Sequence, residues 1–131
     1  MILVDSPVWI RFLANQAPYS QELAKLLSLE QVVGHELVYG ELLIGDRGGR
    51  RKFLSVYQRI PQALLIPHSE VVEFVRYRDL HGRGIGWIDV HLLASALAGR
   101  FQLWTADTRL AAIAAELSIA YQSSGSVNGV V

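Results

Sequence analysis

The chain has 131 residues, 51% of them hydrophobic, which is enough for one ordinary domain with its own core. It contains no cysteine, so disulfide frameworks, thiolate nucleophiles and cysteine-based zinc sites are excluded. Twelve basic and twelve acidic residues give a formal charge of +0, so the net charge alone does not indicate a nucleic-acid binder.

Short apolar runs alternate with helically spaced apolar residues along the chain. In chain order the pattern predicts a strand at 2–4, helices at 6–13 and 20–29, a strand at 31–33, helices at 36–44 and 52–60, a buried strand at 63–66, helices at 69–81 and 88–98, a strand at 101–104, a helix at 107–117 and a strand at 119–121. This order predicts an α/β fold, with a central parallel sheet of about five strands flanked by helices on both faces. We expect one domain over residues 1–122 and a loose tail over 123–131.

Neither a secretory leader nor a membrane span is expected. The apolar run Ile2–Val4 is too short for a signal peptide, and the longest apolar stretch, Trp87–Leu97, contains Asp89 and His91. We therefore expect a soluble, cytoplasmic protein. A mean hydropathy of +0.27 is high for a lone monomer, which favours a partner that covers some of the surface.

Two aspartates follow predicted strands. Asp5 closes the first strand and Asp107 follows the strand at 101–104, and ligands of open α/β sheets gather at this end of the strands. Each aspartate also precedes a helix, where capping of the helix is an alternative explanation for its presence.

Two further carboxylates are predicted on apolar helix faces. At 100° per residue, Asp89 shares a face with Leu92 and Leu93, which should point inward. Glu41 projects from a similar face of its helix, whereas Glu36 lies about 140° away and is the alternative candidate. A buried carboxylate needs a basic partner, a shifted pKa or a cation; an error in the helix phase would instead expose it.

Together these four acids predict a cation site. If Asp5, Glu41, Asp89 and Asp107 converge, each pair of charges about 4 Å apart repels by roughly 4 kcal/mol at an effective dielectric near 20. Oxygen donors favour Mg²⁺ or Mn²⁺, which would offset that repulsion. Ser6 and Thr105 could add supporting hydroxyl contacts.

Other residues are assigned more ordinary roles. The four histidines lack the spacing of a helical zinc site and are expected at the surface or in packing, and the three tryptophans are expected in the core or an interface. A basic cluster is a candidate contact for a substrate backbone, with a solvated loop as the alternative. It comprises Arg47, Arg50, Arg51 and Lys52.

Four blocks of this sequence resemble the motif blocks of PIN domains, and the VapC toxin branch most of all. They are Leu3–Ser6, Gly40–Leu43, Trp87–Ala96 and Leu103–Asp107, of which the last two are the most specific. Their order and spacing agree from Met1 to about Tyr121. Pro7 departs from the pattern, because PIN domains usually have a small polar residue there.

The resemblance implies a ribonuclease that hydrolyses RNA phosphodiesters with metal-activated water. Asp5, Glu41, Asp89 and Asp107 would then hold one or two Mg²⁺ or Mn²⁺ ions that orient and deprotonate the attacking water. The resemblance also implies a cognate VapB-type antitoxin as partner, and a homodimer.

Two other classes of protein remain as alternatives. A receiver or phosphatase-like phosphotransfer domain also places Asp at strand ends around Mg²⁺, but Pro7 stands where a dehalogenase-type motif has its second Asp, and the acid pair and late strand-end Lys of a receiver are missing. In a non-catalytic binding domain, the same acids would serve as helix caps and members of ion pairs.

Overall fold

A computed structural model describes residues 1–123 of the chain. Its centre is a parallel sheet with the strand order β2-β1-β3. The strands are β1 (Ile2–Val4), β2 (Val32–Val33) and β3 (Gln102–Trp104). β1 pairs with both neighbours through Leu3, opposite Val33 on one side and Leu103 on the other.

The sheet is lengthened at both edges by single bridges rather than by further strands. Gln62 bridges Gly34 beyond β2, and Ala120 bridges Leu103 beyond β3. In the described part of the chain, the sheet therefore has three strands rather than the predicted five, with one bridge inside the predicted segment 119–121 and the other at Gln62, just before the predicted segment 63–66. The predicted α/β class with a parallel sheet is confirmed, although the two outer segments are much shorter than expected.

The prediction of a buried strand at 63–66 is wrong. Leu64 is 72% exposed, and only Ala63 of this segment is buried. The reason is the length of β2: because the chain enters the next helix at His35, a strand at 63–66 has no ladder partner beyond Gly34. The segment is held by Ser95 instead, whose hydroxyl donates to the Leu64 carbonyl over 2.7 Å.

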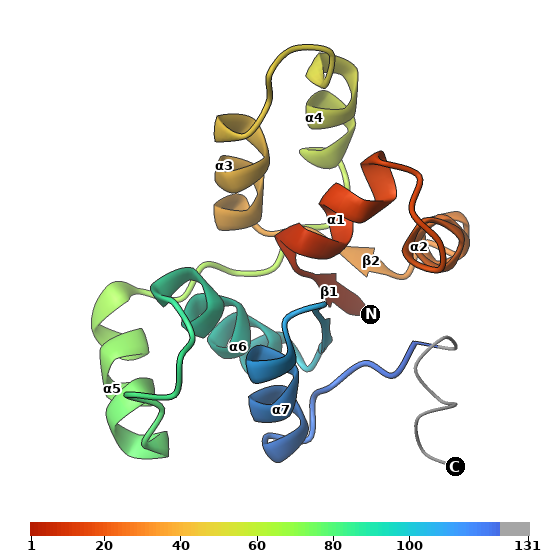
Figure 1. Cartoon of the computed structure of the whole chain (residues 1–131). Coiled ribbons are helices and arrows are strands. Elements are labelled where there is room, and N and C mark those ends of the chain that lie inside the picture. The colour runs from red at the N-terminus through yellow and green to blue at the C-terminus, as the bar shows by residue number, and fades with distance from the viewer. Residues whose placement is uncertain (124–131) are drawn as a thin grey trace.

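Helices cover the sheet. In Figure 1, α1 to α4 lie on one side of the strands and α5 to α7 on the other. Their bounds are α1 (Ser6–Leu13), α2 (Tyr19–Ser28), α3 (Glu36–Ile44), α4 (Arg51–Tyr57), α5 (His68–Arg78), α6 (Trp87–Gly99) and α7 (Thr108–Glu116). No helix within residues 1–123 is long and apolar enough to cross a bilayer.

The ends of β1 and β3 lie side by side at the carboxyl edge of the sheet. All of β1 is buried, as expected for the central strand of a sheet covered on both faces. Directly after it, the Asp5 backbone N–H donates to the Trp104 carbonyl over 2.9 Å, so the chain leaving β1 runs beside the chain leaving β3. Asp5 and Thr105 therefore meet at the carboxyl edge of the sheet. The predicted tail lies outside the described residues apart from Ser123.

Candidate functional site

Asp5 stands at the centre of the acidic site, which we define as Asp5, Glu41, Asp89 and Asp107. Its side chain is only 3% exposed and accepts two hydrogen bonds. The Ser6 backbone N–H donates to Oδ1 over 2.8 Å, and the Thr105 hydroxyl donates to Oδ2 over 2.7 Å. One of these bonds begins α1 and the other crosses to the end of β3, so the carboxylate is held by both elements.

The surroundings of Asp5 favour its neutral form. Burial raises the pKa of Asp5 to about 6, although the hydrogen bonds from Thr105 and Ser6 oppose the rise. The negative charges of Asp89 and Glu41 raise the pKa further. Asp5, directly after β1, therefore lies close enough to Glu41 of α3 and Asp89 of α6 to feel their charges.

Glu41 reaches the site through Ser6. The buried Ser6 hydroxyl donates to Glu41 Oε1 over 2.5 Å, which joins α1 to α3. Glu41 itself is exposed, so its predicted place on an inward apolar face is wrong. Glu36, the alternative candidate, lies elsewhere on α3 beside a cavity lined by Tyr39 and Gln58.

Asp89 occupies the first turn of α6 rather than its buried face. Its Oδ2 accepts from the Gly86 backbone N–H over 2.9 Å, which closes the first turn, and the residue is half-buried. The apolar face predicted around it, with Leu92 and Leu93, is buried as expected. Asp89 therefore stands at the rim of that face, near Asp5.

Asp107 is the N-cap of α7, so the capping role weighed as an alternative is confirmed. Its Oδ1 accepts from the backbone N–H groups of Arg109 and Leu110 over 2.9 and 3.1 Å. Its own N–H donates to the Thr105 hydroxyl over 3.0 Å. Since Thr105 also donates to Asp5, this one hydroxyl links both strand-end aspartates.

No basic side chain forms an ion pair with the four acids of the acidic site within residues 1–123. The ion pairs of Arg76 with Glu73 and of Arg83 with Glu116 lie elsewhere. In the same part of the chain, no three His, Asp or Glu side chains are placed to hold a metal ion. Asp89 and Asp107 each direct a carboxylate oxygen to the backbone of their own helix instead. Among the described residues, Asp5 therefore lies near Glu41 and Asp89 without a basic partner, and Asp107 is connected to it only through Thr105.

The structure does not bring the basic cluster into the acidic site. The cluster spans the loop after α3 and the first turn of α4, at the end of α3 that lies away from the strands (Figure 1). Arg47, Arg51 and Lys52 are exposed and Arg50 is half-buried. The histidines, by contrast, follow the packing prediction in part, since His35 and His91 are buried.

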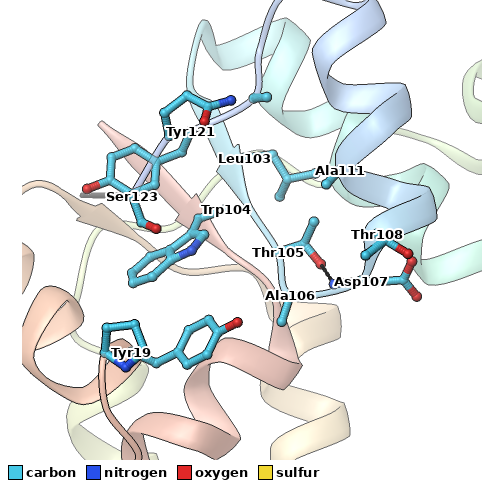
Figure 2. Close-up of a pocket in the computed structure, with 13 residues that line it drawn as sticks. Tyr19, Leu103, Trp104, Thr105, Ala106, Asp107, Thr108, Ala111, Tyr121 and Ser123 are labelled. Atoms are coloured by element: carbon cyan, nitrogen blue, oxygen red, sulfur yellow. Dashed lines mark hydrogen bonds between the residues drawn. The ribbon is translucent and has the colours of Figure 1, made fainter. Parts of the chain in front are cut away.

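One feature beside the site was not predicted from sequence. An aromatic cavity of about 450 Å³ is lined by Tyr19, Trp104 and Tyr121 on one side and reaches Thr105 and Asp107 on the other (Figure 2). Its walls come from α2, β3 and the segment after Ala120, which are far apart in sequence. The only indication of this cavity in the sequence is that an aromatic residue, Trp104, directly precedes Thr105 at the end of β3.

Comparison with known proteins agrees with this arrangement. The family model described as "PIN domain" matches residues 2–116. Ribonuclease VapC32 of Mycobacterium tuberculosis, from strains CDC 1551 and H37Rv, is 40% identical over 121 residues, which are 92% of this chain and 95% of that protein. The crystal structure of FitAcB from Neisseria gonorrhoeae superposes with a TM-score of 0.62 at 25% identity, and covers 92% of this chain and 95% of that one. The chain therefore belongs to the PIN-domain family.

Proposed function

We propose that this protein is a Mg²⁺- or Mn²⁺-dependent endoribonuclease and the toxin of a VapBC-type toxin–antitoxin system. The observation that carries the proposal is Asp5, a buried carboxylate that interacts with two further acids and has no basic partner among the described residues. A divalent cation relieves this repulsion, and an all-oxygen donor set suits Mg²⁺ and Mn²⁺. The relatives named Ribonuclease VapC32 support the choice of RNA as substrate.

In this proposal the four acids of the acidic site hold one or two ions, and the neighbouring hydroxyls position the acids. A bound ion would lower the pKa of water and offset charge on the phosphate during in-line attack. Ser6 orients Glu41, and Thr105 orients Asp5 and the loop of Asp107. In this proposal Asp89 and Asp107 give up their helix-capping contacts to bind the ion.

The basic cluster is proposed to contact the RNA backbone outside the acidic site. Within residues 1–123 none of its side chains forms an ion pair, so their charges are available to phosphates. Contacts of this kind position a nucleic acid without reading its sequence. This role is compatible with the distance of the cluster from the strands, because an RNA chain extends on both sides of its cleaved bond.

We also propose that a cognate VapB-type antitoxin binds this protein in the cytoplasm and that the protein forms a homodimer. Apolar side chains on α3 and α4 support a covered surface: Ile44 is 88% exposed, and Leu43 and Val56 are about half exposed. Exposed apolar side chains, where they form a contiguous patch, mark interaction surfaces in soluble proteins.

Cleavage of a labelled single-stranded RNA tests the proposal. Activity should require Mg²⁺ or Mn²⁺, should stop with EDTA, and should be lost in Asp5→Asn and in Asp89→Asn. Glu73→Gln is the matched control, because it removes an exposed acid on α5 that is remote from the acidic site. Full activity in Asp5→Asn, or activity that survives removal of divalent ions, would refute the metal-dependent mechanism.

A further inference from the structure

The aromatic cavity adjoins the acidic site through shared residues. Thr105 and Asp107 line the cavity, and the Thr105 hydroxyl also holds Asp5. Figure 2 shows Trp104 between Tyr19 and Tyr121, with Thr105 and Asp107 along the opposite wall. Any group that fills the cavity therefore lies beside Thr105 and Asp107, at the edge of the acidic site.

The aromatic wall is built from three rings. The Tyr19 and Trp104 ring centroids are 6.1 Å apart with an interplanar angle of 21°, and the Trp104 and Tyr121 centroids are 5.2 Å apart at 53°. Trp104 is 4% exposed, whereas the two tyrosines are half-buried. The tyrosines are therefore more accessible to a ligand than Trp104, which packs against both of them. Because Trp104 and Arg11 both lie over the Tyr19 ring, a ligand reaches that ring at its edge.

Both tyrosines are anchored from outside the cavity. The Arg11 guanidinium lies 5.1 Å from the centroid of the Tyr19 ring, and the Tyr121 hydroxyl donates to a Glu22 carboxylate oxygen. These contacts fix the rings before any ligand binds, which lowers the entropic cost of binding.

The chemistry of the lining selects a neutral planar ligand. Among the described residues around the cavity, Asp107 alone carries a formal charge, and it is negative, so a phosphate is disfavoured inside. Aromatic rings stack on any nucleobase, because every base presents a π face. A volume of about 450 Å³ also falls within the range of roughly 300 to 1,000 Å³ typical of small-molecule sites.

We infer that the aromatic cavity is a nucleobase subsite, which receives the base next to the cleaved phosphodiester of the RNA. This inference rests on the proposed ribonuclease function and adds a binding site to it. Tyr19 and Tyr121 contact the base, and Trp104 acts as a positioning residue behind them. Removal of one stacking ring is expected to weaken binding by about 5- to 150-fold.

Titration of the metal-free, full-length protein with adenosine, guanosine, cytidine and uridine, followed by tryptophan fluorescence, tests the subsite without any cleavage. We expect saturable quenching by at least one nucleoside. Tyr19→Leu, which keeps an apolar wall but removes the aromatic ring, should weaken nucleoside binding by about 5-fold or more. Trp104→Phe should remove the signal, since Trp104 is the tryptophan at the cavity. Tyr77→Ala is the control, because Tyr77 is 85% exposed on α5 and does not line the cavity.

Several outcomes would overturn the subsite. They are no saturable quenching by any nucleoside, unchanged affinity in Tyr19→Leu with native circular dichroism, and quenching that persists in Trp104→Phe but is lost in Trp87→Phe. Steady-state cleavage of RNA separates this inference from the function on which it rests. A higher KM with unchanged kcat in Tyr19→Leu supports the subsite. Normal cleavage without nucleoside binding rejects the subsite alone. Nucleoside binding without any RNA cleavage rejects the ribonuclease function, and with it the place of the bound base next to a cleaved phosphodiester.

Discussion

Replacement of Asp5 by Asn should stabilise the metal-free protein at neutral pH while it removes activity. Burial raises the pKa of Asp5 from 3.8 to about 6, so the folded state disfavours the ionised carboxylate. Such a group contributes stability that is complete below pH 3.8 and is lost as the pH rises through about 6. At 1.36 kcal/mol for each pH unit, the loss is roughly 3 kcal/mol.

His35 acts with the opposite sign over nearly the same range. Burial lowers the pKa of His35 from 6.5 to about 4, and the nearby His91 lowers it further. Its contribution is present above pH 6.5 and is lost as the pH falls toward 4, again by roughly 3 kcal/mol. The two residues should nearly cancel in the wild type. Asp5→Asn leaves His35 uncompensated, so its free energy of unfolding should rise by roughly 3 kcal/mol between pH 4 and 6.5.

Urea unfolding followed by circular dichroism, in EDTA at several pH values, measures this difference. Glu73→Gln removes an equal charge from an exposed position and should follow the wild-type curve. Added Mn²⁺ at pH 7 should narrow the gap between wild type and Asp5→Asn, because binding stabilises only the protein that retains its site. Parallel curves for wild type and Asp5→Asn across pH 4 to 6.5 would refute the reasoning.

Further outcomes follow from the same contacts. Ser6→Ala and Thr105→Val each remove a hydroxyl that positions an acid, and each should lower metal affinity or cleavage by about 10- to 100-fold in Mn²⁺ titrations of activity; an effect below twofold would contradict the positioning role. Neutralisation of the basic cluster to glutamine should raise KM for RNA and flatten its salt dependence while kcat is kept; an unchanged salt slope would place RNA elsewhere. Ser95→Ala should cost about 1–3 kcal/mol in thermal unfolding, because the buried His35 Nε2, 2.9 Å from the Ser95 hydroxyl, loses its partner; an unchanged Tm would show that the bond is replaced.

The strand-end part of the site could be predicted because parallel neighbours share one edge. The order of strands and helices indicated that β1 and β3 lie in one sheet, and Asp5 and Thr105 then meet by register alone. The positions of the acids on helices, Glu41 and Asp89, were harder to predict, because an error of one residue in the helix phase moves a side chain by about 100° around the helix. Asp89 belongs to the first turn of α6 and Glu41 is exposed, yet both act on Asp5 across space.

The remaining features depend on contacts between distant segments. Whether residues 63–66 can pair as a strand depends on the length of β2. That length cannot be predicted from the sequence of 63–66 itself. The aromatic cavity needs Tyr19 and Tyr121 to approach Trp104 from α2 and from the end of the described chain. Periodicity predicts that each of these aromatic side chains packs against other apolar residues, but it does not predict that a cavity remains between them.

Three of the four acids stand at helix amino termini: Asp5 and Asp107 as N-caps, and Asp89 in the first turn of α6. The aligned peptide dipoles give these helix ends a partial positive charge, which stabilises the ionised carboxylates in the absence of a metal ion. Folding and loading with metal can then be separate events. The chain can then fold when the concentration of free Mg²⁺ is low, and the carboxylates that later bind the cation are already in place.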